Sequence, residues 1–390
     1  MAEADQLDMD EVRAALAEMG ADGWLLFDFH GVNPVTSRVL GISGMATRRL
    51  FVLVPREGAP VAVAHKIELQ PLQGFEGEIR PYARWQELAA ELKPLVEGKT
   101  LAMEVFPQDS VPYLDRVPAG VVEMLTGMGA RVIPSAPLVT RFAARWHPDE
   151  AADHRFAAEA IARVARDVLA EVVADPGSGV REAAVQGRVV EAMHDAGLEL
   201  DTPPIVAFGA NAANPHYEPV PGSDAPLAPG VVLLDLWGGR RRDTVFADQT
   251  WMAYAGGAPP ARVVEVWDTV RAARDEAVAV IRRAVEAGRP IAGYEGDRAA
   301  RGVIEAAGFG RYFVHRTGHS IDRDLHGSGP HLDDYETHDD RLLMPGVGFS
   351  VEPGIYLPGE FGVRSEINMY WGPDGMEVTP ERPQMGLIVA

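Results

Sequence analysis

GFSVEPGIYLPGEFGVRSEINMY, residues 348–370, contains two runs of strand-forming residues on either side of a turn. The connection Pro358-Gly359-Glu360 has glycine at its centre, as short β-hairpin loops commonly do. Folding the chain about Gly359 places Glu352 directly opposite Glu366. Directly opposed residues of antiparallel strands have Cβ atoms about 5 Å apart, and like charges there are destabilising. The stretch therefore predicts a hairpin whose paired acids need a counter-charge.

A second hairpin with paired acids is predicted upstream. An apolar run that ends at Asp235 and a strand-like run that contains Asp248 flank the glycine- and arginine-rich residues 238–242. A turn between Arg241 and Arg242 would place Asp235 opposite Asp248. Burying ionised carboxylates without partners costs several kcal/mol each. The acids of each pair are therefore protonated, exposed to water or bound to a cation.

Five histidines lie between the two hairpins, and those at positions 315, 319 and 326 are the candidates for the site. Neutral imidazole binds transition metals, whereas carboxylate oxygens also suit harder cations. Four carboxylates and His319 therefore indicate a mostly oxygen site for manganese, cobalt, iron or zinc, as a pair of ions bridged by carboxylates. His315 and His319 have the spacing of a zinc-protease helix, but the H-E-x-x-H glutamate is missing and Gly318 intervenes, which favours a strand or loop.

Composition restricts the class of protein. The chain has 390 residues, which favours about two domains, and 47% of them are apolar without a long charge-free stretch, which argues against a membrane protein. A net charge of -21 argues against nucleic acid or anionic membranes as partners. Cysteine is absent and the acidic N-terminus has no signal-peptide pattern, so we expect a cytoplasmic protein.

Helical and strand periodicities divide the chain into two domains. Residues 1–146 alternate helix and strand, which predicts a small α/β domain, whereas residues 147–390 begin with a long alanine-rich helix and predict an α+β domain. Helices are expected at 9–19, 85–92, 119–128, 149–174, 181–196, 261–287 and 294–307, and N-terminal strands at 24–27, 49–54, 60–64, 101–105 and 131–133.

The order Asp235, Asp248, His319, Glu352, Glu366 resembles the five-ligand signature of the pita-bread metallopeptidases, the family of prolidase, aminopeptidase P and methionine aminopeptidase. Similar local stretches lie at 208–217, 315–319, 352–356 and 362–366. The resemblance implies a pita-bread catalytic domain preceded by a creatinase-like N-terminal domain. It also implies a homodimer in which the N-terminal domain overhangs the partner's site.

The resemblance assigns a role to each matching residue. Asp235 would hold one divalent ion, His319 and Glu352 the other, and Asp248 and Glu366 both, with manganese as the first choice. Glu352 would also act as general base toward a water activated by the metals.

Further residues match positions around the family's substrate. His326 would donate to the carbonyl oxygen, His216 would position the substrate, His315 would form the pocket wall and Arg364 would lie at the site rim. The alternatives are a turn residue for His216, a core histidine for His315 and a plain ion-pair partner for Arg364, which in a regular strand would point to the pleat opposite that of Glu366.

The implied reaction is cleavage of the bond between an N-terminal residue and proline, whose imide lacks an N–H group. A cation such as Arg316, Arg323 or Arg364 that meets the C-terminal carboxylate would select dipeptides, which favours a prolidase-like Xaa-Pro dipeptidase. The alternatives are an aminopeptidase P-like enzyme on longer peptides and an enzyme of the same fold on a small non-peptide compound. A metal-free enzyme or a binding module is disfavoured because every ligand is present.

The chain departs from the family pattern at Trp251, at residues 320–323 and after His326, where Gly327-Ser328 follows. We expect these residues in the pocket wall, where they would affect substrate preference.

Overall fold

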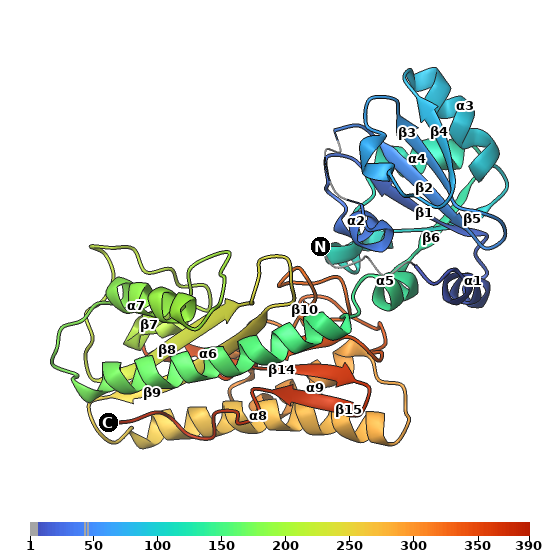
Figure 1. The fold of residues 1–390 in the computed structure, drawn as a ribbon. Helices are drawn as coiled ribbons and strands as arrows, with labels where there is room; N and C mark the ends of the chain where they lie inside the picture. The colour runs from blue at the N-terminus through green and yellow to red at the C-terminus, as the bar shows by residue number, and fades with distance from the viewer. Residues whose placement is uncertain (1–6, 43, 45–46) are drawn as a thin grey trace. The chain divides into compact units, whose positions relative to one another are not determined.

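Contacts between residues divide the chain into two units, Met1–Ala143 and Ala144–Ala390. The structure is a computed structural model and describes residues 7–42, 44 and 47–390. The division lies close to residue 146, where the sequence pattern changes from alternating elements to a long helix (Figure 1).

The N-terminal unit is a mixed six-stranded sheet with helices on both faces. The strand order is β4-β3-β2-β1-β5-β6. Along β1, Trp24 and Leu26 pack with α1, α2 and α5, whereas Leu25 and Phe27 pack with α3 and α4, as the two-residue period of a strand requires. The elements are α1 (Met9–Glu18), β1 (Gly23–Asp28), α2 (Pro34–Leu40), β2 (Leu50–Pro55), β3 (Val61–His65), β4 (Glu78–Tyr82), α3 (Trp85–Val96), β5 (Thr100–Met103), α4 (Ala119–Gly127), β6 (Arg131–Pro134) and α5 (Ala136–Phe142).

The C-terminal unit contains three antiparallel sheets and four long helices. The sheets have the orders β7-β8-β9, β12-β13 and β10-β11-β14-β15. Within the described residues, no helix combines the length and apolar character needed to cross a bilayer. The elements are α6 (Pro148–Ala174), α7 (Glu182–Asp195), β7 (Ile205–Phe208), β8 (Gly230–Gly238), β9 (Ala247–Ala255), α8 (Ala261–Glu286), α9 (Gly293–Ala306), β10 (Ser320–Ile321), β11 (Gly348–Val351), β12 (Gly354–Leu357), β13 (Phe361–Arg364), β14 (Ile367–Gly372) and β15 (Gly375–Thr379).

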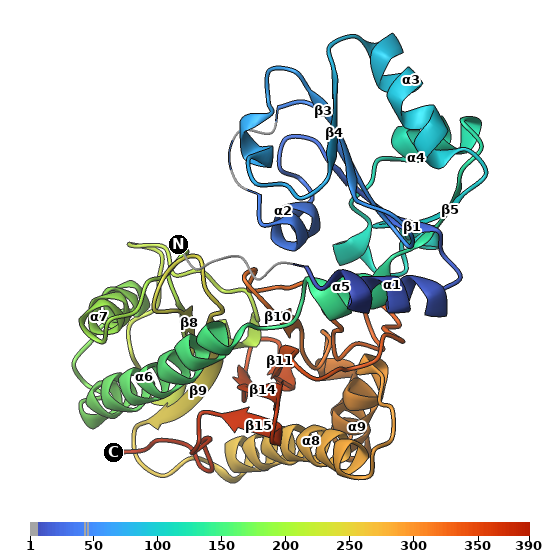
Figure 2. The ribbon, with the colours of Figure 1, turned by 45° about the vertical axis from the view of Figure 1, so that its right-hand side comes forward.

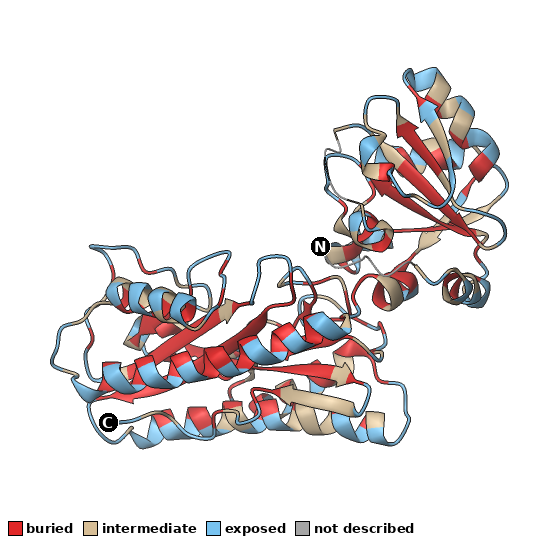
Figure 3. Ribbon diagram, in the orientation of Figure 1, coloured by how far each residue is buried: buried red, intermediate tan, exposed pale blue. Residues whose placement is uncertain are grey.

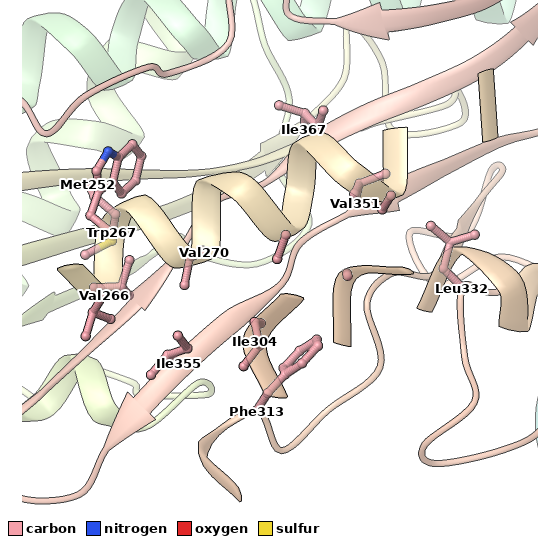
Figure 4. Close-up of a cluster of buried hydrophobic side chains, with 14 of the residues drawn as sticks. Met252, Val266, Trp267, Val270, Ile304, Phe313, Leu332, Val351, Ile355 and Ile367 are labelled. Carbon is pink, nitrogen blue, oxygen red and sulfur yellow. The ribbon is translucent and has the colours of Figure 1, made fainter. Parts of the chain in front are cut away.

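The long helices cover opposite faces of the ligand-bearing strands. On β8, Val232 and Leu234 pack with α6 and α7, whereas Val231 and Leu233 face the cluster formed with α8 and α9. Figure 2 shows α6 running along β8 and β9, with α8 and α9 beside the other strands, and the strands are almost wholly buried (Figure 3). Trp267 of α8 lies among the labelled aliphatic side chains of Figure 4, which come from helices, strands and loops.

The predicted helices and N-terminal strands are confirmed to within a few residues, and two α-helices and one strand of the N-terminal unit were missed, as were β7, β10 and β15 of the C-terminal unit. Helices α2 and α5 have seven residues each, too short for a clear helical period, and β4 is polar and contains Pro81.

The register confirms one hairpin prediction and corrects the other. Leu357 pairs with Phe361 around Gly359, and the pairs on either side set Glu352 opposite Glu366, as predicted. The prediction that Asp235 faces Asp248 is wrong.

Upstream, Asp235 pairs with Thr250, and Asp248 pairs with Trp237. Instead of a tight turn, a longer loop joins β8 to β9, and its residues Arg240 and Arg241 form ion pairs with Asp153 of α6. A shift of two residues keeps Asp235 and Asp248 on the same face of the sheet.

The C-terminal segment lies along the outer edge of β9. The side-chain amide of Gln384 donates to the Met252 carbonyl (2.6 Å) and accepts from the Met252 N–H (2.9 Å). Ile388 forms a parallel bridge with Ala253. The strand that carries Asp248 is therefore bonded on both edges.

A close backbone approach at Gly318 gives a first prediction. A Cβ atom there would lie 2.0 Å from the Ser350 carbonyl oxygen, so Gly318→Ala should reduce the free energy of unfolding by about 1–3 kcal/mol. Gly302 in α9 has nothing within 4 Å of such an atom, and Gly302→Ala should stabilise by about 0.5–1 kcal/mol. Urea titration measures both values, and equal effects would contradict the steric argument.

Candidate metal centre

The structure brings the five predicted ligands together. Asp235 and Asp248 lie on β8 and β9, and the other three flank β10, β11 and β14. The candidate ligand atoms of Asp248, His319 and Glu366 all lie within 4.8 Å of one another. His319 Nε2 is 3.5 Å from Asp248 Oδ2 and 3.4 Å from Glu352 Oε1. Asp235 is linked to Glu366 by the Thr250 hydroxyl, whose Oγ1 is 3.0 Å from Asp235 Oδ1 and 2.8 Å from Glu366 Oε2.

Hydrogen bonds orient the His319 ring toward the acids. Its Nδ1 lies 3.1 Å from the Ser320 carbonyl oxygen, which fits an Nδ1–H donor and leaves the Nε2 lone pair facing Asp248 and Glu352. The His319 N–H donates to Ser350 Oγ (2.9 Å), and the Ser350 hydroxyl donates to Glu352 Oε1 (3.0 Å). Metal-binding histidines are typically held in this way by their second ring nitrogen.

The acids are buried and short of hydrogen-bond donors. Burial raises the pKa of Asp248 to about 7 and raises the pKa of Glu366 well above its ordinary value, with repulsion from the neighbouring carboxylates adding to both shifts. Burial is also the main cause that raises the pKa of Asp235. Among the described residues, Asp248 Oδ1 and Glu366 Oε1 are buried oxygens without a hydrogen-bond partner. Buried carboxylate oxygens without hydrogen-bond partners, close to further acids and to His319, are the electron-pair donors that a divalent cation requires, so the residues fit a metal.

Arg364 is in direct contact with the acid cluster. Its Nη2 pairs with Asp235 Oδ2, its Nε donates to Thr250 Oγ1 (2.7 Å) and its Nη1 donates to the Pro215 carbonyl (3.4 Å). Only 3% of the residue is exposed, so it does not form a solvent-facing rim. The expectation that it points to the pleat opposite Glu366 is wrong, because residues two apart share a face. Arg364 thus supplies a permanent positive charge to the cluster.

The loop that follows β10 brings His326 beside His319, with ring centroids 4.3 Å apart. Asp322 holds this loop, accepting from the Asp324 N–H (2.9 Å) and from the Ser328 N–H and hydroxyl (both 2.8 Å). Asp322 and Ser328, which lie where the chain departs from the family pattern, therefore anchor the loop that carries His326.

The other two predicted histidines lie in different settings. His315 Nδ1 is 2.7 Å from the Arg316 carbonyl and its Nε2 is 2.8 Å from the Tyr356 hydroxyl, and burial lowers the pKa of His315 to about 4. His216 is exposed, and its backbone N–H donates to Asn214 Oδ1 (3.2 Å).

Trp251 does not lie in the pocket wall, contrary to expectation. Its indole N–H donates to Gln249 Oε1 (2.8 Å) and its ring packs in the cluster formed with α6 and α7. Alternate residues of β9 point to opposite faces, so Thr250 faces the acids instead. The role of Thr250 was missed, although its position two residues after Asp248 predicts a shared face.

The raised pKa of Asp248 predicts how the stability of the metal-free protein depends on pH. A carboxyl group whose pKa is raised by folding stabilises the fold at low pH, and this contribution is lost as the pH rises from about 4 to about 7. His154 and His315, with pKa values lowered to about 4 by burial, act in the opposite direction. Their contribution cancels when wild type is compared with Asp248→Asn.

With a chelator present, unfolding free energies measured at pH 5 and pH 7.5 should therefore show wild type losing stability relative to Asp248→Asn as the pH rises. Added Mn²⁺ should restore wild type at pH 7.5 but not the variant. A stability difference that is independent of pH would contradict the raised pKa.

Three known proteins are similar to this chain over most of its length. The probable dipeptidase PepE of Mycobacterium tuberculosis is 30% identical over 84% of this chain and 82% of that protein. The crystal structure of dipeptidase PepE from Mycobacterium ulcerans matches with a TM-score of 0.74 at 25% identity, covering 98% of this chain and 96% of that one. The Xaa-Pro dipeptidase from Bacillus anthracis matches with a TM-score of 0.69 at 25% identity over 100% of both chains.

The model of metallopeptidase family M24 matches residues 153–371, which include all five candidate ligands. The N-terminal α/β unit and the antiparallel C-terminal unit together follow the architecture of the matched dipeptidase structures. The chain therefore belongs to metallopeptidase family M24, the pita-bread family of metal-dependent hydrolases, and is an enzyme of that class.

Proposed function

We propose that this enzyme is an Xaa-Pro dipeptidase that uses two divalent metal ions, with manganese preferred. The observation that carries the proposal is the convergence of four carboxylates and one histidine in which two buried oxygens lack hydrogen-bond partners among the described residues. The names of the related proteins, dipeptidase PepE and Xaa-Pro dipeptidase, support the substrate class.

The proposed ligand roles are those that the family resemblance implies, and the convergence of the five side chains supports them. Asp235 would hold one ion, His319 and Glu352 would hold the other, and Asp248 and Glu366 would be shared between them. A donor set of mostly oxygen atoms supports manganese. When bound, the ions supply Lewis acidity toward a water molecule and a peptide carbonyl.

Glu352 has the properties of a general base. Burial alone would raise its pKa, but the positive charges of His319, Arg364 and Arg316 hold the pKa of Glu352 below its ordinary value. The carboxylate is therefore ionised near neutral pH and able to accept a proton from water.

His326 is proposed to donate a hydrogen bond to the carbonyl oxygen of the substrate. Desolvation lowers the pKa of His326 to about 3, with the charge of His319 contributing next, so its ring is a neutral donor near pH 7. His216 is proposed to hold the substrate beside the scissile bond.

Arg316 is the proposed anchor for the C-terminal carboxylate of a dipeptide. Of the three arginines considered, Arg364 is paired with Asp235, and Arg323 is paired with Glu150. Arg316 is mostly buried, lies 3.8 Å from Glu336 in an ion pair, and its charge helps to lower the pKa values of both Glu352 and His326, which supports a position beside the proposed substrate site. A charge-assisted contact to Arg316 would favour dipeptides over longer peptides.

Replacing a ligand that contacts both ions should abolish activity. Asp248→Asn and Glu366→Gln should each lower Ala-Pro hydrolysis at least about 100-fold, because metal affinity falls when a ligand is removed. Elemental analysis of the purified variants should show less bound metal than wild type. Asp374→Asn, in the exposed turn between β14 and β15, is the matched control and should leave both values unchanged. Wild-type turnover in either ligand variant would refute the assignment.

Substrate length tests the role of Arg316. Arg316→Gln should raise KM for Ala-Pro about 10- to 100-fold, as loss of a charged hydrogen bond does, and should leave KM for the amidated dipeptide nearly unchanged. Arg323→Gln is the control and should behave as wild type with both substrates. Faster wild-type cleavage of Ala-Pro-Gly-Gly than of Ala-Pro would overturn the dipeptidase assignment in favour of an aminopeptidase P-like activity.

A further inference from the structure

The chain segment that carries His216 has little regular structure of its own. It starts in the short 3-10 helix Gly209–Ala213 and continues through Asn214, Pro215 and His216 to Tyr217. His216 is exposed, so the placement of its ring depends on what holds the backbone on either side. The structure provides one buried carboxylate for this purpose.

Glu182, the first residue of α7, binds both ends of this segment. The residue is fully buried (0% exposed). Its Oε1 accepts from the Phe208 N–H (2.6 Å), where the segment begins, and its Oε2 accepts from the Tyr217 hydroxyl (2.6 Å), where it ends. The side-chain amide of Asn211, in the middle, donates to the same carboxylate (3.0 and 3.1 Å). One side chain therefore fixes three points of the segment.

The chemistry of this site requires an anion. The hydrogen-bond partners of the Glu182 carboxylate described above are donors, and so is the Ala225 N–H (2.7 Å). The Glu182 N–H in turn donates to the Ala225 carbonyl. An amide at this position would turn its own N–H groups toward some of these donors. Burial and the Glu182 charge both raise the pKa of Tyr217, so the phenol stays protonated and remains a donor.

Two contacts hold the segment from the side of the metal centre. Arg364, which pairs with Asp235, donates through Nη1 to the Pro215 carbonyl (3.4 Å), one residue before His216. A Cβ atom at Gly362 would lie 1.9 Å from the Ala212 carbonyl oxygen, so glycine permits β13 to approach the segment. The segment is thus held between Glu182 and the strand that leads to Glu366.

We propose that Glu182 is a positioning residue: by holding the backbone of residues 209–217, it places the His216 side chain where it can contact the substrate. The inference rests on the proposed function, in which His216 holds the substrate beside the scissile bond. A displacement of about 1 Å in a positioning group costs up to about 100-fold in rate. Glu182 is not one of the five candidate ligands, and its carboxylate bonds to Phe208, Asn211, Tyr217 and Ala225, so it acts through residues 209–217.

The test combines two measurements on the metal-loaded, full-length protein. Hydrogen–deuterium exchange of residues 209–217 reports how firmly the segment is held, independently of activity. Steady-state kinetics with Ala-Pro are measured for Glu182→Gln, His216→Ala and the double variant, which form a double-mutant cycle. Tyr217→Phe removes one of the bonds and serves as a milder variant if Glu182→Gln folds poorly.

Asp224 offers a matched control. It is a buried carboxylate that caps the same helix, accepting from the Ala183 N–H (3.0 Å), Arg181 Nε (2.9 Å) and the Gly222 N–H (3.1 Å). None of these donors belongs to residues 208–217. Asp224→Asn should therefore lower thermal stability without changing exchange in residues 209–217 or kcat/KM.

We expect Glu182→Gln to speed exchange in residues 209–217 and to lower kcat/KM on the order of 10- to 100-fold, mostly through KM. In the His216→Ala background the same change should have less than about a threefold effect, because residues that act together are not additive. Tyr217→Phe should shift both readouts in the same direction by less.

Equal losses in both backgrounds, or unchanged exchange, would overturn the positioning role. Absence of Ala-Pro turnover in the wild-type enzyme would instead refute the proposed substrate, while the exchange comparison would still decide whether Glu182 holds the segment.

Discussion

The catalytic unit depends on four mutually repelling carboxylates around one histidine, of which Asp235, Asp248 and Glu366 are buried and Glu352 is mostly buried. Desolvation and repulsion raise the pKa values of Asp235, Asp248 and Glu366, and the protein offsets only part of this cost. Arg364, Thr250 and Ser350 satisfy some of the oxygens, and two oxygens remain without partners among the described residues. A site held in this state favours a divalent cation over a proton, because the cation meets several carboxylates at once.

The surrounding fold holds these charged side chains close to one another. Each ligand lies in or beside a different strand, so the cluster forms only when the antiparallel sheets pack together. Glycine permits two close backbone approaches around the cluster, at Gly318 against Ser350 and at Gly362 against Ala212. The apolar faces of α6 and α8, each on its own side of the strands, contribute the hydrophobic burial that offsets the electrostatic cost.

Local sequence predicts local geometry well and long-range contacts poorly. The opposition of Glu352 and Glu366 follows from a short turn with glycine at its centre, and it is confirmed. The pairing of Asp235 was predicted wrongly, because the loop before β9 bonds to α6, more than seventy residues earlier in the chain. The direction of Arg364 was also mistaken, although a two-residue spacing from Glu366 was available in the sequence. The anchoring roles of Asp322 and Glu182 depend on backbone donors, which no residue pattern displays.

The bonding of the C-terminal segment to β9 also affects self-association. A sheet edge with unpaired backbone groups is a template for another chain, and β9 is the last strand of its sheet. Gln384 and Ile388 occupy that edge beside Met252 and Ala253. Because these residues occupy backbone groups at the edge of β9, they oppose the pairing of that edge with a strand of another chain. The protected strand is the one that carries Asp248.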